Sequence, residues 1–129
     1  MSKQQSGFTL IELIAVLVIL GILAATAVPR FVDLSDAAET AALQSIAGSI
    51  ESASALNHAV DVANEAGLTL DTPVNTLNCN TAAALMQGGA LPDGYSVAAL
   101  AVADKASVTC TLSNAGGLTE NFVMIGAQP

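Results

Sequence analysis

The 129-residue sequence has few of the residues that build catalytic, metal-binding or base-stacking sites. It has no tryptophan, one tyrosine and three phenylalanines, so no aromatic platform for stacking bases or sugars can be recognised. Its lone histidine, His58, is expected at a helix surface or groove. No serine–histidine–aspartate set and no phosphate-binding glycine loop is present. The composition therefore predicts a protein that is not an enzyme and needs no cofactor.

Basic residues are also scarce. Lys3, Arg30 and Lys105 are the only cations against eleven acidic residues, which gives a formal net charge of −8. A surface with this excess of negative charge repels phosphate backbones and anionic lipid headgroups. We therefore expect no nucleic-acid partner and interpret the acidity as an aid to the solubility of an exported surface.

The sequence does contain one long apolar run, which extends from Phe8 to Val28. As a helix it would rise about 31 Å, the thickness of the hydrocarbon core of a bilayer. Only Thr9, Glu12 and Thr26 interrupt it, and only Glu12 is charged. A carboxylate inside a membrane costs roughly 2.5–3.5 kcal/mol on insertion scales. The run predicts a membrane-spanning helix whose carboxylate needs a partner.

A partner for Glu12 arises if the chain is cut after Gly7. Phe8 would then carry a free α-amine with a pKa near 8, which is mostly cationic at neutral pH. Within one chain the first helical turns hold this amine away from the carboxylate. The amine of one chain meets Glu12 of the next if the chains are axially staggered. Phe8 and Glu12 are therefore the predicted assembly residues.

The segment Gly7-Phe8-Thr9-Leu10-Ile11-Glu12-Leu13, after a short polar leader, resembles the cleavage and methylation signature of type IV prepilins. The similarity continues through Gly21, Pro29 and Arg30-Phe31. It extends into the segments 33–37 and 41–44, where it resembles pilins of the mannose-sensitive haemagglutinin type. About half of the chain is covered.

The resemblance implies a leader, residues 1–7, and a single pilin domain, residues 8–129, with a hydrophobic segment 8–30 and a helix plus β head in 31–129. It also implies cleavage between Gly7 and Phe8 by a prepilin peptidase and N-methylation of Phe8. The precursor would lie in the inner membrane, and Lys3 favours a cytoplasmic N-terminus. Inner-membrane assembly machinery would then build an extracellular filament of this chain, for adhesion, aggregation or motility.

Three other interpretations remain open. Residues 1–27 could form an ordinary secretory signal ending in Ala25-Thr26-Ala27, although Glu12 and Pro29 argue against it. A pseudopilin of a type II secretion system shares the processing motif and the helix. A monomeric bitopic membrane protein with an acidic exported domain would leave Glu12 without a partner.

Gly21 and Pro29 frame a weak helical segment, because glycine disfavours the helix and proline removes a backbone hydrogen bond. We expect a kink there, or melting into extended chain in a tight filament, as in related pili. Beyond Pro29, apolar residues at three-and-four spacing predict an amphipathic helix to about Asn64, ended by Gly67. Its predicted inner face includes Leu56 and Val60.

The remaining half of the chain predicts a small antiparallel sheet packed on the amphipathic part of the helix, which makes the fold α+β and pilin-like. The expected elements are a short helix over 82–87, capped by Thr81, and strands over 95–102, 107–112 and 121–125. Cys79 and Cys110 match no zinc or redox motif, so in an exported chain they predict a disulfide, with two buried thiols as the alternative.

No metal site is predicted. Asp33, Asp36 and Glu39 have helical spacing but suit a solvated face. Asp104, Asn114 and Glu120 could approach one another as calcium-binding residues do in secretion pseudopilins, although three oxygen-bearing residues scattered over the C-terminal segment are a weak pattern.

Overall fold

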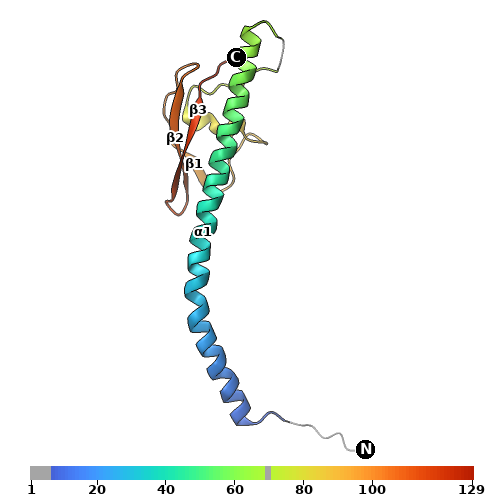
Figure 1. Ribbon diagram of the computed structural model, residues 1–129, viewed down its shortest axis with the longest axis vertical. Helices are drawn as coiled ribbons and strands as arrows, with labels where there is room; N and C mark the ends of the chain where they lie inside the picture. Colours follow the sequence, from blue (N-terminus) through green and yellow to red (C-terminus); the bar gives the residue numbers. More distant parts are fainter. Residues whose placement is uncertain (1–6, 69–70) are drawn as a thin grey trace, which may run out of the picture. The chain divides into compact units, whose positions relative to one another are not determined.

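The computed structural model describes residues 7–68 and 71–129, with only the backbone described for residues 28–33. Helix α1 (Leu10–Glu65) is followed by a 3-10 helix η1 (Cys79–Leu85) and strands β1 (Tyr95–Val97), β2 (Ser107–Asn114) and β3 (Thr119–Ile125). The strands form one antiparallel sheet in the order β1-β2-β3. This arrangement, visible in Figure 1, confirms the predicted α+β, pilin-like fold. The chain divides into two compact units, Met1–Ala38 and Glu39–Pro129.

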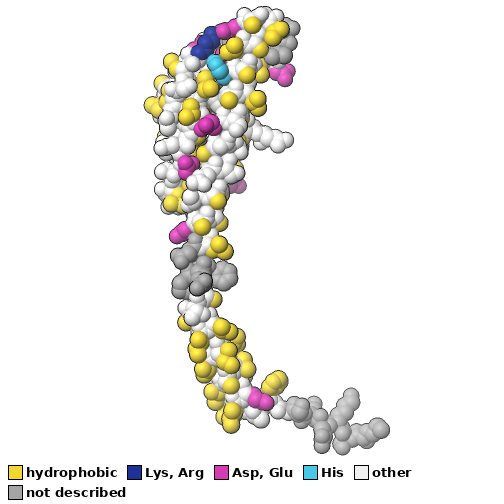
Figure 2. All heavy atoms as spheres, in the orientation of Figure 1, with side chains coloured by type: hydrophobic (Ala, Val, Ile, Leu, Met, Phe, Trp, Pro, Cys, Tyr) yellow, Lys and Arg dark blue, Asp and Glu magenta, His cyan; other side chains and the backbone are white. Residues whose placement is uncertain are grey.

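In the first unit, the part of α1 from Leu10 to Ala27 is apolar all round apart from Glu12 and Thr26. Leu10–Ala27 has a mean hydropathy of 2.7 and is the one segment of the described chain that is long and apolar enough to cross a membrane. Its leucine, isoleucine and valine side chains are exposed, and Figure 2 shows hydrophobic side chains crowded over this part of the helix. A helix that is hydrophobic all round needs a membrane or other apolar helices around it.

Helix α1 continues through Gly21 and Pro29. The side chain of Pro29 lies outside the described residues, so the kink or melting expected at this segment stays a prediction. The C-terminal end of α1 follows the expected signal. Gly67 has φ 85°, Gly67 N–H donates to Asn64 C=O, and Leu68 N–H donates to Ala63 C=O. These two bonds form the Schellman motif, which needs a left-handed residue at this position.

In the second unit, Leu43, Ala47 and Ile50 of α1 pack against the inner face of the sheet. The sheet contributes Cys110 and Leu112 from β2, and Phe122 and Met124 from β3, to the same core. Cys79, Ala82 and Val102 complete this core, whose members are all fully or almost fully buried. Figure 1 shows the sheet alongside this part of α1. The alternation Val108, Cys110, Leu112 predicted the inner face of β2 correctly.

The helix face turns polar beyond Ile50, which the sequence did not predict. Ser54, Asn57 and Asp61 occupy the inward positions, whereas the predicted inner residue Leu56 is 70% exposed. The reason is that the inner face meets backbone groups. Ser54 Oγ accepts the Ile125 N–H, while the Asn57 amide exchanges two hydrogen bonds with Val74. These bonds satisfy backbone groups that would otherwise be buried without partners.

The short helix and the three strands differ in type or in bounds from those predicted. The predicted helix over 82–87 is instead η1, which begins after the N-cap Asn78 rather than after Thr81. The predicted strand over 95–102 stops at Val97, because the following residues pair elsewhere. Cys79 N–H donates to Leu100 C=O, and Val102 N–H donates to Leu77 C=O. Strands β2 and β3 are each two residues longer than predicted, at the end of β2 and at the start of β3.

Gly126 follows β3 at a close approach between two backbone segments. A Cβ atom at this position would lie 2.1 Å from the Ala103 carbonyl oxygen. We expect Gly126→Ala to lower the free energy of unfolding by about 3 kcal/mol, since backbone has to move to relieve the clash.

Gly48→Ala is the control, because a Cβ there meets nothing within 4 Å. This helical substitution should be neutral or stabilise by up to about 1 kcal/mol. Denaturant unfolding followed by circular dichroism measures both, and an unchanged midpoint for Gly126→Ala would contradict the predicted clash.

Candidate assembly site at the head of the apolar helix

The first turn of α1 is held by reciprocal hydrogen bonds between Thr9 and Glu12. Thr9 N–H donates to Glu12 Oε2 at 2.9 Å, and Glu12 N–H donates to Thr9 Oγ1 at 3.3 Å. This is a capping box, in which each side chain satisfies a backbone N–H that the helix leaves unpaired. The pattern Thr-x-x-Glu before an apolar run was a readable signal for it, and the sequence reasoning missed it.

The capping box fixes the position of the Glu12 carboxylate at the helix start. It leaves the carboxylate able to accept further hydrogen bonds. A carboxylate offers about four acceptor positions, and the Thr9 backbone uses one of them. Phe8 lies just before the helix and is 94% exposed. The site therefore presents one fixed negative charge beside the residue that would carry the new amine. The leader residues 1–6 lie outside the described residues, and cleavage after Gly7 stays a prediction.

The predicted disulfide is confirmed. Cys79 and Cys110 are bonded, with their Cα atoms 5.7 Å apart, and both residues are fully buried. The bond joins the first residue of η1 to the middle strand of the sheet. It ties the loop-rich segment after α1 to the core of the second unit, where few other large apolar side chains are available.

The candidate cation ligands are not brought together. Asp104 precedes β2 and Asn114 ends it, so the length of β2, about 24 Å, separates Asp104 from Asn114. Glu120 pairs with Leu112 near the Asn114 end of the strand, away from Asp104. The Asn114 amide donates instead to the Glu39 carboxylate of α1. The side chain of Asp33 lies outside the described residues. Among the described residues, no group of three histidine, cysteine, aspartate or glutamate side chains is placed to hold a metal.

His58 is half-buried on α1, in agreement with a groove position. Its Nδ1 atom is buried and has no hydrogen-bond partner among the described residues. No nucleophile of the described chain is bonded to this ring, so the geometry assigns it no catalytic role.

The capped apolar helix lies at the N-terminal side of a small sheet that is linked by a disulfide to η1. Residues 2–28 match the family model of the prokaryotic N-terminal methylation motif. The chain carries this motif and is homologous over part of its length to one type IV pilus component and to one type II secretion core protein.

Two curated relatives are similar to part of the chain. The chain is 58% identical over 50 residues to the type IV narrow pilus major component PilA5 of Thermus thermophilus, covering 39% of this chain and 43% of that protein. It is 60% identical over 37 residues to the type II secretion system core protein G of Pseudomonas aeruginosa, covering 29% of this chain and 26% of that protein. The aligned segments span less than half the length of either relative. No solved structure matches the chain significantly.

Proposed function

We propose that this chain is the precursor of a type IV pilus subunit, cut after Gly7, methylated on the Phe8 amine and polymerised into an extracellular filament. The observation that carries the proposal is the fixed Glu12 carboxylate at the head of an exposed apolar helix. In a lone membrane helix this carboxylate serves only the capping box and adds to the cost of insertion, whereas in a polymer it also offers a subunit-specific contact. The similarity to the narrow-pilus component supports the same function.

The electrostatics favour pairing between chains. Two opposite charges about 4 Å apart interact by roughly 4 kcal/mol at an effective dielectric constant of 20. This attraction is enough to offset the roughly 2.5–3.5 kcal/mol that a carboxylate costs in an apolar environment. The Glu12 carboxylate of one subunit would therefore accept the Phe8 amine of its neighbour and set the axial register between them. In the filament, the segment between Gly21 and Pro29 would kink or melt.

Before assembly, the apolar helix would anchor the precursor in the inner membrane with the leader on the cytoplasmic side. A prepilin peptidase would act at Gly7–Phe8, and the inner-membrane pilus machinery would transfer the processed chain into the filament. The acidic second unit would lie on the filament surface, where it would serve adhesion, aggregation or motility.

A pseudopilin role is the second candidate, favoured by the similarity to a type II secretion core protein. Both candidates use the same helix and processing site, so they differ in where the polymer is found. A pseudopilin would form a short polymer required for protein secretion, whereas a pilin would form long filaments outside the cell.

Immunogold electron microscopy of whole cells distinguishes these two functions. We expect antibody against the second unit to label long surface filaments that disappear when this chain is deleted and return on complementation. Protein secretion should be unchanged in the deletion strain. Unlabelled filaments together with a secretion defect would replace the pilus assignment by the pseudopilin one.

A further inference from the structure

The sheet of the second unit has one face against the core and one outward face. The outward face consists of Ser96 on β1, of alternate residues from Ser107 to Ser113 on β2, and of alternate residues from Thr119 to Ile125 on β3. The strand register defines this set, because residues paired across antiparallel strands share a face. All of these residues are serine, threonine or asparagine except Val123 and Ile125, and each is exposed or half-buried.

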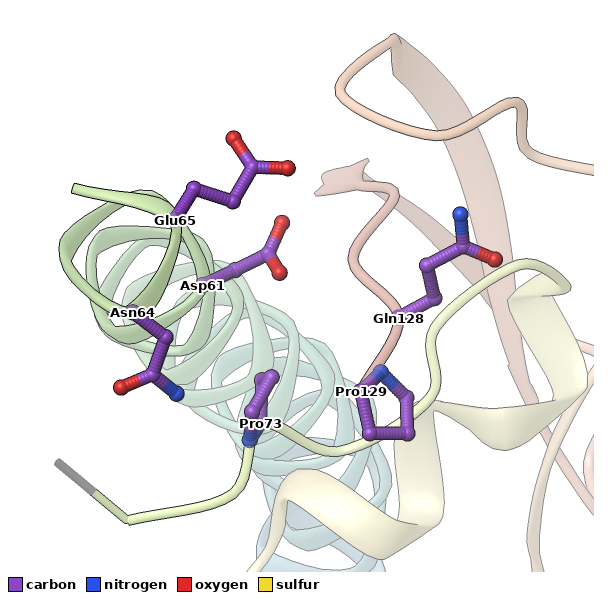
Figure 3. Close-up of a pocket in the computed structure, with 6 residues that line it drawn as sticks. All are labelled: Asp61, Asn64, Glu65, Pro73, Gln128 and Pro129. Atoms are coloured by element: carbon purple, nitrogen blue, oxygen red, sulfur yellow. The ribbon is translucent and has the colours of Figure 1, made fainter. Parts of the chain in front are cut away.

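The outward face carries no charge, although the chain has eleven acidic residues against three basic ones. The only charged residue of the three strands is Glu120, which pairs with the core residue Leu112 and therefore lies on the inner face. Acidic side chains gather elsewhere. Asp61 and Glu65, for example, line a pocket of about 340 Å³ between the last turns of α1 and the C-terminal segment, which Figure 3 shows. The outward face is thus an uncharged surface on an acidic molecule.

Two pairs of polar side chains on the outward face are hydrogen-bonded to each other. The Ser96 and Ser113 hydroxyls lie 3.1 Å apart across β1 and β2, and Thr111 Oγ1 donates to Asn121 Oδ1 at 3.0 Å. Covering a polar group is costly when its hydrogen bonds to water are lost without replacement. Because these pairs keep a hydrogen bond when water leaves, covering this face costs less than covering a charged surface.

The outer edge of β3 is already occupied by side chains of α1. Glu51 Oε2 accepts the Val123 N–H, and Ser54 Oγ accepts the Ile125 N–H. These are backbone donors with which an added strand would pair. A partner on this side of the sheet therefore contacts the side chains of the outward face and does not extend the sheet at β3.

We propose that the outward face docks against the same face of a second copy of this chain in a neighbouring filament, so that filaments associate side by side. This inference rests on the proposed pilus function. Charge selects the occupant, since a cationic partner is attracted to the acidic surfaces and an anionic partner is repelled by the net charge of −8. A second copy is equally acidic, so it approaches closely only where neither surface carries a charge.

The size of the outward face indicates that the contact acts between filaments rather than between free subunits. Strand β2 is about 24 Å long and three strands span about 14 Å, which gives an area of roughly 300 Å². A stable interface buries about 800 Å² on each partner. One contact is therefore too small to hold a dimer, whereas two filaments repeat the contact along their length and combine its effect.

Low-speed sedimentation and electron microscopy of filaments sheared from cells test this contact. We expect wild-type filaments to form lateral bundles. The bundled fraction should rise with salt concentration, because salt screens the repulsion between the acidic surfaces around the contact.

Two charge variants of an exposed residue on the middle strand make the test specific to the outward face. Thr109→Glu and Thr109→Lys should each lower the bundled fraction by roughly tenfold or more, because a charge of either sign loses its water at every repeated contact. Thr109→Val should keep bundling, since it leaves the face uncharged. The number of filaments per cell should be unchanged in all three variants, which shows that the subunits still fold and assemble.

Gln87→Glu and Gln87→Lys are the matched controls. They make the same changes in charge at an exposed residue that follows η1 and lies outside the three strands. Filaments of both variants should form bundles as wild-type filaments do.

Three results would overturn the inference. Wild-type filaments that stay single at every salt concentration would assign the outward face to a partner other than this chain. Increased bundling of Thr109→Lys filaments would show that the net charge of the chain alone controls association. Equal loss of bundling in the Gln87 and Thr109 variants would show that the outward face is not specific. Absence of filaments from wild-type cells is a different failure, because it would contradict the pilus function itself.

Discussion

Cells that make only the Glu12→Leu chain are expected to display few or no filaments, although the chain still reaches the membrane and is still cut after Gly7. The substitution removes the carboxylate that would attract the Phe8 amine of the neighbouring subunit, and it leaves that amine unpaired in an apolar filament core. In a non-polymerising membrane protein, the same change would be neutral or would improve insertion. Electron microscopy counts the filaments, and an immunoblot measures the membrane-associated, processed chain. Together they distinguish a pilus subunit from a non-polymerising membrane protein.

The capping box provides a sharper pair of variants. Glu12→Gln keeps a side chain that can complete the cap and removes only the charge, since glutamine serves at this position of a capping box. Thr9→Ala weakens the cap and keeps the carboxylate. If assembly depends on charge, Glu12→Gln should abolish filaments and Thr9→Ala should retain them. The reverse result would assign Glu12 a role in helix initiation alone.

Removing the disulfide is the second change with a large expected effect. Cys110→Ser should lower the free energy of unfolding of the second unit by about 3.5 kcal/mol, the chain-entropy value for closing a loop of this length. The loss is large because the core beside the bond is small and several of its members are alanine or cysteine. Denaturant unfolding measures the stability, and filament counts should fall with it.

Two controls test whether the bond itself is responsible. Cys79→Ser should match Cys110→Ser, and reduction of the wild-type chain should lower its unfolding midpoint toward that of the variants. Reduction should have no effect on either variant. Equal stability of oxidised and reduced wild-type protein would show that packing, and not the bond, holds the second unit together.

The main elements could be predicted because their sequence patterns are strong. The apolar run, the three-and-four spacing after Pro29 and the alternation around Cys110 each have one ready structural interpretation. The predicted continuation of β1 to residue 102 failed because small apolar residues do not specify a pairing partner. Backbone bonds of Leu77 and Cys79 compete for this segment, and they are invisible in the sequence.

Candidate sites could likewise be predicted where their sequence pattern is local, and not where distant segments form them. Gly7, Phe8 and Glu12 could be identified because their motif is local and lies at the head of the apolar run. The pocket around Asp61 could not, because its lining joins α1 to Gln128 and Pro129, which come more than 60 positions later in the chain. Leu56 was assigned to the inner face by its hydrophobicity, whereas the structure places polar side chains there to satisfy backbone groups.

The intact mass of protein sheared from the cell surface tests the central proposal most directly. We expect the mass of residues 8–129 increased by one CH2 unit, the net gain when a methyl group replaces a hydrogen of the Phe8 amine, and decreased by two hydrogens for the Cys79–Cys110 bond. Fragmentation should place the methyl group on the first residue. A surface chain that begins at Met1, or at Val28 after ordinary signal cleavage, would contradict processing at Gly7 and with it the assignment to a pilus subunit.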